Sequence, residues 1–296
     1  MARRRRAERF YACGALVRPR AARSTRTLDS ILCTVPDSSP DPLDTAIADS
    51  VELLAKFCVP LYQYDRRRRP RLNGTGFFVR SGKHDFLVSA AHVLDTAKSD
   101  GLFFYSGART LRHLSGKLLR SRGEDNRSQD LIDVGVVLLS KDSVPPYPGV
   151  DKFPMDISYL RPSYRPRTGK DYVFVGFPGS KSKINPMRQE VLIAPYAFRN
   201  QPIDEGQYKA HGLDPKTHIA MTLDVRKGFG PKGMPQQFPD PHGMSGSPIV
   251  VLFDHEGSND SRVFPVAGVA TSYRKSDRLV FGTDISYVVD AIRNAV

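Results

Sequence analysis

Three short segments of the chain carry residue types that together could perform nucleophilic catalysis. His92 follows the segment 88–91, Asp133 precedes an apolar run, and Ser245 lies in the glycine-rich segment 242–248. A serine hydroxyl is a poor nucleophile at neutral pH and needs a base within hydrogen-bond reach. Histidine suits that role because it titrates near physiological pH. A buried carboxylate beside the histidine would hold the imidazole in one tautomer and stabilise the imidazolium that forms.

Two aspartates could provide that carboxylate. Asp130 follows the polar stretch 126–129, where a solvated carboxylate costs nothing. Asp133 directly precedes 134–139, a run apolar enough to form a buried strand, and a carboxylate there loses hydration unless it is hydrogen-bonded. The imidazole of His92 would supply that bond, so we predict that Asp133 is the partner.

The glycines beside Ser245 fit the remaining requirement of this chemistry. A carbonyl oxygen under attack becomes negative and needs hydrogen-bond donors that are already in place. Gly243 and Gly246 let the backbone turn tightly and aim its N–H groups at that oxygen.

Short strands separated by turn residues must position these groups. From about residue 50 onward we expect strands at 59–64, 74–79, 85–89, 134–139, 172–176, 190–194, 219–223, 249–253, 266–271 and 279–282. A short helical turn is expected at 90–94, and the apolar spacing of 287–296 predicts a terminal helix. Many short strands and one closing helix favour all-β barrels over a parallel α/β sheet.

Four motifs, in chain order, resemble those of the trypsin-like serine peptidases. They are Gly-Thr-Gly-Phe at 74–77, Ser-Ala-Ala-His at 89–92, Asp-Val-Gly-Val at 133–136 and Gly-Met-Ser-Gly-Ser-Pro at 243–248. The resemblance covers roughly residues 50 to 296 and is closest to bacterial HtrA-like peptidase domains, here without a PDZ domain. It implies two antiparallel six-stranded β-barrels of the chymotrypsin type with a C-terminal helix.

That resemblance also implies domain boundaries. We expect a flexible Arg-rich leader over 1–45 and a peptidase domain over 46–296, with barrels at about 50–145 and 165–285 and a terminal helix at about 286–296.

The resemblance implies a function and its residues. The chain is expected to be a serine endopeptidase that cleaves peptide bonds through an acyl-enzyme, with His92, Asp133 and Ser245 as its triad. The N–H groups of Gly243 and Ser245 would form the oxyanion hole. The substrate pocket would involve Asp240, His242, Thr271, Ser272 and Tyr273. The alternative is an inactive protease-fold protein that acts as a binding or scaffold module.

Met244 departs from the pattern of the digestive members of that family. These members carry an aspartate at the equivalent position, and it pairs with a freed N-terminus. We therefore expect no maturation by N-terminal cleavage.

The net charge of +13 is concentrated in two places. Residues 1–28 carry +8 and residues 65–71 carry +4, so the rest of the chain is nearly neutral. Because no nucleic-acid-binding motif accompanies them, we interpret these segments as a solvated tail and loop. A nucleic-acid partner of the leader remains the weaker alternative. The expected partners are a protein or peptide substrate and a regulatory protein.

No cofactor or metal site is expected, since no His, Cys and acidic residues cluster at metal-ligand spacing. The three cysteines, Cys13, Cys33 and Cys58, form no Cys-x-x-Cys pair and are read as reduced thiols. No apolar stretch is long enough to span a membrane and no secretory signal is visible, so an intracellular, cytoplasmic location is expected.

The choice between the two aspartates is open to a direct test. Asp133→Asn should lower kcat by about 10³–10⁴-fold, because asparagine favours the wrong imidazole tautomer. Asp130→Asn should lower it by less than about tenfold. Both variants are to be assayed on one peptide substrate, and a crippled Asp130→Asn with an active Asp133→Asn would contradict the assignment.

Overall fold

A computed structural model describes residues 42–96, 101–106, 110–121, 130–145, 152–162, 167, 169–185, 190–252 and 264–296 of the chain. Most of the predicted leader lies outside the described residues, as do Cys13 and Cys33. The described residues belong to the unit Pro40–Val296.

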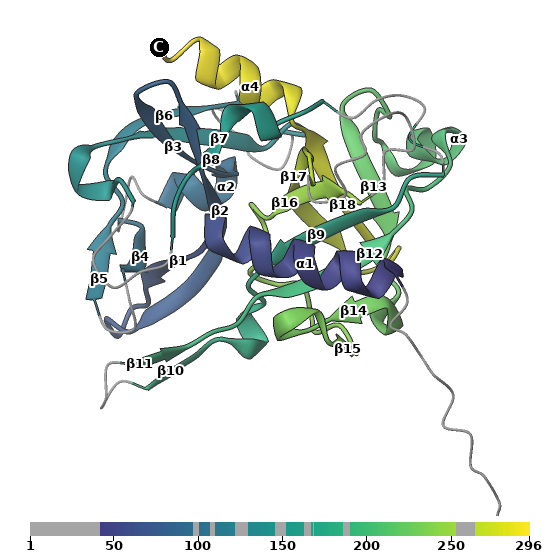
Figure 1. The fold of residues 1–296 in the computed structure, drawn as a ribbon, viewed down its shortest axis with the longest axis horizontal. Helices are drawn as coiled ribbons and strands as arrows, with labels where there is room; N and C mark the ends of the chain where they lie inside the picture. The colour runs from purple at the N-terminus through teal and green to yellow at the C-terminus, as the bar shows by residue number, and fades with distance from the viewer. Residues whose placement is uncertain are drawn as a thin grey trace, which may run out of the picture. The chain divides into compact units, whose positions relative to one another are not determined.

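The N-terminal half of this unit forms an eight-stranded sheet (Figure 1). Its strands are β1 (Cys58–Tyr64), β2 (Pro70–Ser81), β3 (His84–Ala90), β4 (Phe103–Ser106), β5 (Thr110–His113), β6 (Gly116–Arg120), β7 (Val134–Leu139) and β8 (Met155–Asp156). Their order is β5-β4-β1-β2-β3-β7-β6, and β8 pairs in parallel with β2.

The C-terminal half forms a second eight-stranded sheet. Its strands are β9 (Tyr172–Gly176), β12 (Tyr196–Asn200), β13 (His218–Thr222), β14 (Gly228–Phe229), β15 (Pro235–Gln236), β16 (Pro248–Val251), β17 (Val266–Arg274) and β18 (Leu279–Asp284). Their order is β13-β18-β17-β16-β9-β12-β14-β15. A separate hairpin pairs β10 (Lys183–Asn185) with β11 (Glu190–Leu192).

Four α-helices occur in the described residues, and only α1 is longer than eight residues. They are α1 (Pro42–Phe57), α2 (Ala91–Asp95), α3 (Glu205–Tyr208) and α4 (Ser286–Arg293). Single 3₁₀ turns occur at η3 (Lys141–Ser143), η4 (Ile157–Tyr159), η5 (Gly179–Lys181), η6 (Lys209–His211), η7 (Val225–Lys227) and η8 (Pro231–Gly233). None of the helices in the described residues is long and apolar enough to cross a membrane.

The fold class is the predicted one: all-β, with two antiparallel sheets and a C-terminal helix, in the manner of a chymotrypsin-like double barrel. Each sheet has eight strands in the described residues instead of the expected six, because short segments such as β8 and β15 also pair. Strands β7 and β9 have the predicted bounds.

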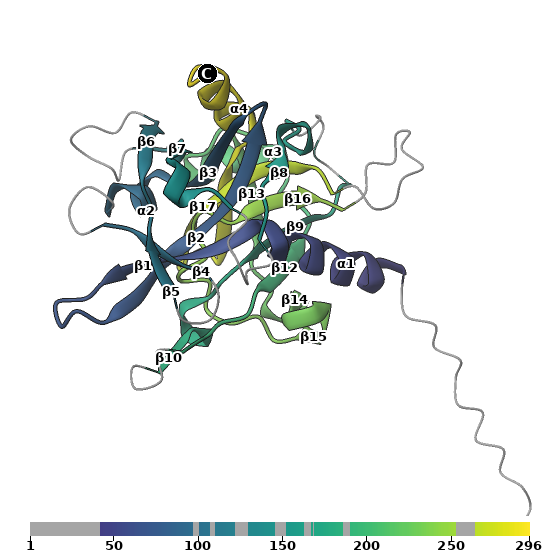
Figure 2. The same cartoon turned by 60° about the vertical axis from the view of Figure 1, so that its left-hand side comes forward.

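Helix α1 was not predicted, and it begins inside the segment expected to be a flexible leader. Its apolar residues Ile47, Val51 and Leu54 recur at helical spacing and are buried, at 0%, 1% and 2% exposed. They join an apolar cluster that also holds Val173 from β9. Figures 1 and 2 both show α1 lying beside β9. A truncation at Asp49 would therefore divide a packed helix.

Helix α4 returns the end of the chain to the first sheet. Val288 and Ile292 are buried in the cluster that contains Val134 and Val136 of β7. In Figure 1 the helix lies next to β7, where it contacts that strand. The C-terminal helix therefore packs against the strand that begins at Asp133.

The packing of α1 can be tested by truncating one buried side chain. Leu54→Ala should lower the free energy of unfolding by about 2–5 kcal/mol, because it leaves a cavity in the cluster. The exposed neighbour Glu52 provides the control, since Glu52→Ala should change it by less than about 0.5 kcal/mol. Chemical denaturation measures both, and equal effects would show that α1 does not pack as described.

Candidate active site

The pairing of two strands brings His92 and Asp133 together. Ala90, the last residue of β3, pairs with Val134, the first residue of β7. The chain continues from β3 into α2, which carries His92, and enters β7 from Asp133. The N–H of Ala91 donates to the carbonyl of Asp133 at 2.8 Å, which closes the corner between the two segments.

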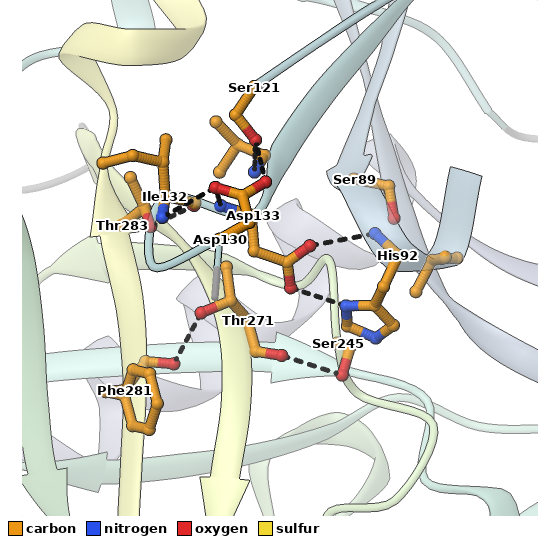
Figure 3. Close-up of polar contacts among 12 residues, drawn as sticks. Ser89, His92, Ser121, Asp130, Ile132, Asp133, Ser245, Thr271, Phe281 and Thr283 are labelled. Carbon is orange, nitrogen blue, oxygen red and sulfur yellow. Dashed lines mark hydrogen bonds and ion pairs between the residues drawn. The ribbon is translucent and has the colours of Figure 1, made fainter. Parts of the chain in front are cut away.

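The Asp133 carboxylate uses both oxygens on His92. Oδ2 lies 2.6 Å from the ring Nδ1 of His92, and Oδ1 accepts the backbone N–H of His92 at 2.9 Å (Figure 3). Because an ionised carboxylate only accepts, Nδ1 carries the proton and Nε2 keeps its lone pair in the neutral ring. The pair therefore leaves Nε2 as the basic nitrogen.

Asp133 adopts an unusual backbone conformation that its neighbours hold in place. Its φ of 41° is in the left-handed region, which costs a non-glycine residue about 1–2 kcal/mol. The Asp130 carboxylate accepts the N–H groups of Ile132 at 3.2 Å and Asp133 at 3.1 Å. Ser121 Oγ donates to Asp130 at 2.7 Å. Asp130 is half-buried and holds the Asp133 turn, a role that its polar surroundings in the sequence did not predict.

The second sheet also holds this turn. His218 on β13 lies with Nε2 2.9 Å from the carbonyl of Leu131. Its Nδ1 accepts the N–H of Asp214 at 3.2 Å, so Nε2 is the nitrogen that donates. Thr283 on β18 donates its hydroxyl to the carbonyl of Ile132. Both side chains are buried, which removes competition from water.

Ser245 lies in the loop before β16, and residue Thr75 of β2 holds that loop. The N–H of Thr75 donates to the carbonyl of Ser245 at 2.8 Å, and Thr75 Oγ1 donates to the carbonyl of Gly243 at 3.1 Å. The same hydroxyl accepts the N–H of Phe177 at 3.1 Å. Gly246 passes so close to the carbonyl of Thr75 that a Cβ there would lie 2.0 Å from this oxygen. A glycine is therefore required at 246.

The Ser245 hydroxyl lies near the His92 ring. Figure 3 shows it on the side of the imidazole away from Asp133. In this structure Oγ donates to the carbonyl of Thr271 at 3.2 Å.

The peptide between His242 and Gly243 has a defined direction. The carbonyl of His242 accepts the N–H of Gly179 at 2.7 Å. Because C=O and N–H of a trans peptide point in opposite directions, the N–H of Gly243 points away from Gly179. Gly243 has a φ of 92°, which glycine adopts without strain. The backbone of the loop therefore fixes the direction in which the N–H of Gly243 points.

The five residues predicted for the substrate pocket are not all brought together. Ser272 and Tyr273 line a narrow cavity next to Ser245. Thr271 lines, with Ser272, a second cavity of about 320 Å³ that includes His92, Asp133 and Asp130. Asp240 and His242 line neither of these cavities and are exposed, and the Asp240 carboxylate accepts the N–H of His242 at 2.9 Å.

Cys58 lies in β1, outside the site. Cys58 is fully buried, and burial raises the pKa of its thiol to about 12, so the reactive thiolate is scarce at neutral pH. Within the described ranges, no group of three or more His, Cys, Asp or Glu side chains is placed to hold a metal ion.

The sequence did not reveal how four residues shape the site: Thr75, Asp130, His218 and Thr283. Thr75 was noted only as part of the motif at 74–77, and Asp130 only as a possible partner of His92. Asp130 had a readable signal, because an aspartate commonly accepts backbone N–H groups two and three residues ahead. Thr75, His218 and Thr283 act on segments that are distant in sequence, so no local pattern shows what they bind.

Comparisons with known proteins add little to this geometry. No known protein-family profile matches the chain. No curated protein matches it either. Among solved structures, a Glu endopeptidase in complex with MPD is similar over 80% of this chain and 89% of its own, with 12% identity and a TM-score of 0.44. A likeness this loose carries no conclusion, and the all-β double-sheet fold is established by the strand pairing itself.

The role of the Thr75 hydroxyl in holding the Ser245 loop can be tested with two substitutions, one that removes the hydroxyl and one that keeps it. Thr75→Val should lower the free energy of unfolding by about 1–3 kcal/mol, because the Gly243 carbonyl and the Phe177 N–H lose a buried partner. Thr75→Ser keeps the hydroxyl and should stay within about 1 kcal/mol of the parent. Denaturant titration measures both, and a Thr75→Val protein as stable as the parent would refute this role.

Proposed function

We propose that the chain is a serine endopeptidase in which Ser245 is the nucleophile, His92 the general base and Asp133 the orienting carboxylate. The observation that carries the proposal is the two-bond pairing of Asp133 with His92, which leaves Nε2 basic on the side where Ser245 lies. Hydrolysis of a peptide bond by a serine requires a histidine that is held in one orientation and keeps a basic nitrogen toward the serine. The pairing of Asp133 with His92 meets this requirement.

In the proposed first step, Ser245 Oγ attacks the carbonyl carbon of the scissile peptide while its proton passes to His92 Nε2. This step requires the hydroxyl to turn from the Thr271 carbonyl toward the imidazole. The imidazolium is stabilised by the Asp133 carboxylate, 2.6 Å from Nδ1. The oxyanion is held by the N–H groups of Gly243 and Ser245, as the resemblance implies.

Breakdown of this intermediate breaks the C–N bond. His92 gives its proton to the leaving amine, and the acyl group stays on Ser245 as an ester. Water then attacks the ester with His92 again as base, and Ser245 regains its proton when the acid product leaves.

We also propose that this enzyme is active without a cleavage that frees a new N-terminus. Met244 is 2% exposed and belongs to an apolar cluster with Phe174 and Val280, so it offers no carboxylate to an incoming amine. The loop is instead held by Thr75 and Gly179 through the bonds described above. We propose that the enzyme is most similar to HtrA-like peptidase domains. Its proposed substrate is a protein or peptide.

The function is tested by removing the nucleophile. Ser245→Ala should lower peptide cleavage by about 10³–10⁶-fold while the fold is kept, because only transition-state binding remains. The exposed serine Ser276 gives the control, and Ser276→Ala should cleave at the parental rate. A fluorophosphonate probe should label the parent at Ser245 and leave Ser245→Ala unlabelled.

Two results would count against the proposal. Cleavage by Ser245→Ala near the parental rate would show that another group is the nucleophile. A folded parent that neither cleaves nor takes the probe would favour the alternative, a protease-fold protein that binds without catalysis.

A further inference from the structure

A narrow, largely apolar cavity opens beside Ser245. The space open to the centre of a water-sized sphere is about 20 Å³. One water needs about 10–15 Å³ by the same measure, so the enclosed part of the cavity is about the size of one or two waters and suits a short side chain. Its lining consists of Phe174, Pro241, Met244, Ser245, Ala270, Ser272, Tyr273 and Val280.

Two facing residues narrow this cavity. Tyr273 of β17 and Val280 of β18 are direct partners in the antiparallel pairing. Side chains of such partners stand on the same face of the sheet, with Cβ atoms about 5 Å apart. Both line the cavity, and Val280 is 3% exposed. A tyrosine opposite a β-branched residue therefore occupies the width that a long substrate side chain would need.

The deeper wall is fixed by packing. Phe174 is 1% exposed, and its ring contacts Phe198 and Phe238 with centroids 5.4 and 5.6 Å away. Met244 and Ala270 are buried in the same cluster as Phe174. Close-packed interiors resist the insertion of extra atoms, so this wall does not give way easily.

The cavity also lacks charge. Among the described residues that line it, none is an Asp, Glu, His, Lys or Arg. Arg274, the nearest cation along β17, lines the neighbouring cavity, where it bonds to Asp277 at 3.3 Å and lies over the Phe281 ring. A charged substrate side chain would lose its hydration here without gaining a partner.

We propose that this cavity selects a small uncharged residue, such as alanine, serine or valine, as the residue whose carbonyl Ser245 attacks, called P1. The inference rests on the proposed function and names its substrate class. Tyr273 and Val280 are the residues that determine the specificity, by excluding longer side chains. The Asp240 carboxylate, which was expected in the substrate pocket, lies outside this cavity and so offers no partner to a basic side chain there.

The test uses peptides that are identical except at P1, each ending in a fluorogenic amine, with Ala, Val, Phe, Lys or Glu at that position. The full-length chain should show kcat/KM values for Ala or Val at least about 100-fold above those for Phe, Lys and Glu. A preference for Phe, Lys or Glu would overturn the inference while leaving the proposed function intact.

Variants of the two facing residues test the cause of the selection. Tyr273→Gly, alone or with Val280→Ala, should raise kcat/KM for Phe relative to Ala by at least about tenfold. Tyr273→Phe keeps the ring and should keep the parental order of substrates. Tyr287→Ala, at an exposed position of α4, is the control outside the site and should match the parent in both rate and order. An unchanged order in Tyr273→Gly would contradict the assigned role.

A binding measurement separates this inference from the proposed function. The same peptides are titrated into Ser245→Ala by calorimetry, where no cleavage is needed. The Ala and Val peptides should bind more tightly than the Phe, Lys and Glu peptides. Equal binding would overturn the inference, whereas failure of the parent to cleave or to take the fluorophosphonate probe would overturn the proposed function.

Discussion

The site depends on one short interaction, the pairing of the Asp133 carboxylate with both the ring and the backbone N–H of His92. A carboxylate at the edge of a buried strand loses its water, and these two bonds replace that hydration. The pairing also sets which ring nitrogen is basic. The backbone of Asp133 is left in a left-handed conformation that is uncommon for a non-glycine residue.

Such a conformation persists only when its surroundings over-determine it. Here the two sheets do so together. His218 and Thr283 of the second sheet bind the carbonyls of the Asp133 turn, which belongs to the first sheet. In the opposite direction, Thr75 of the first sheet binds the loop that carries Ser245 in the second. Each half of the fold therefore positions a proposed catalytic group of the other, and neither half alone would hold the site.

The substrate cavity follows from the same packing. The strand that supplies the Thr271 carbonyl continues into Tyr273, and the pairing of Tyr273 with Val280 narrows the space beside Ser245. The aromatic cluster around Phe174 fixes the opposite wall. The proposed selection by size would be a property of this sheet face and would need no mobile loop.

Local patterns in the sequence were sufficient to identify His92, Asp133 and Ser245 as candidates, the all-β class and strands such as β7 and β9. They succeed because alternating or continuous apolar runs, turn residues and glycines act through neighbours in the chain. Helix α1 was also readable from its apolar spacing, and it was missed because the preceding residues looked like a linker. Only the tertiary structure decided what Thr75, His218 and Thr283 do, and that Asp240 stays outside the cavity. The bonds of Thr75 to Gly243 and of Thr283 to Ile132 span 168 and 151 residues of chain. Contacts at that separation depend on strand register and on how the two sheets pack, which no local pattern encodes.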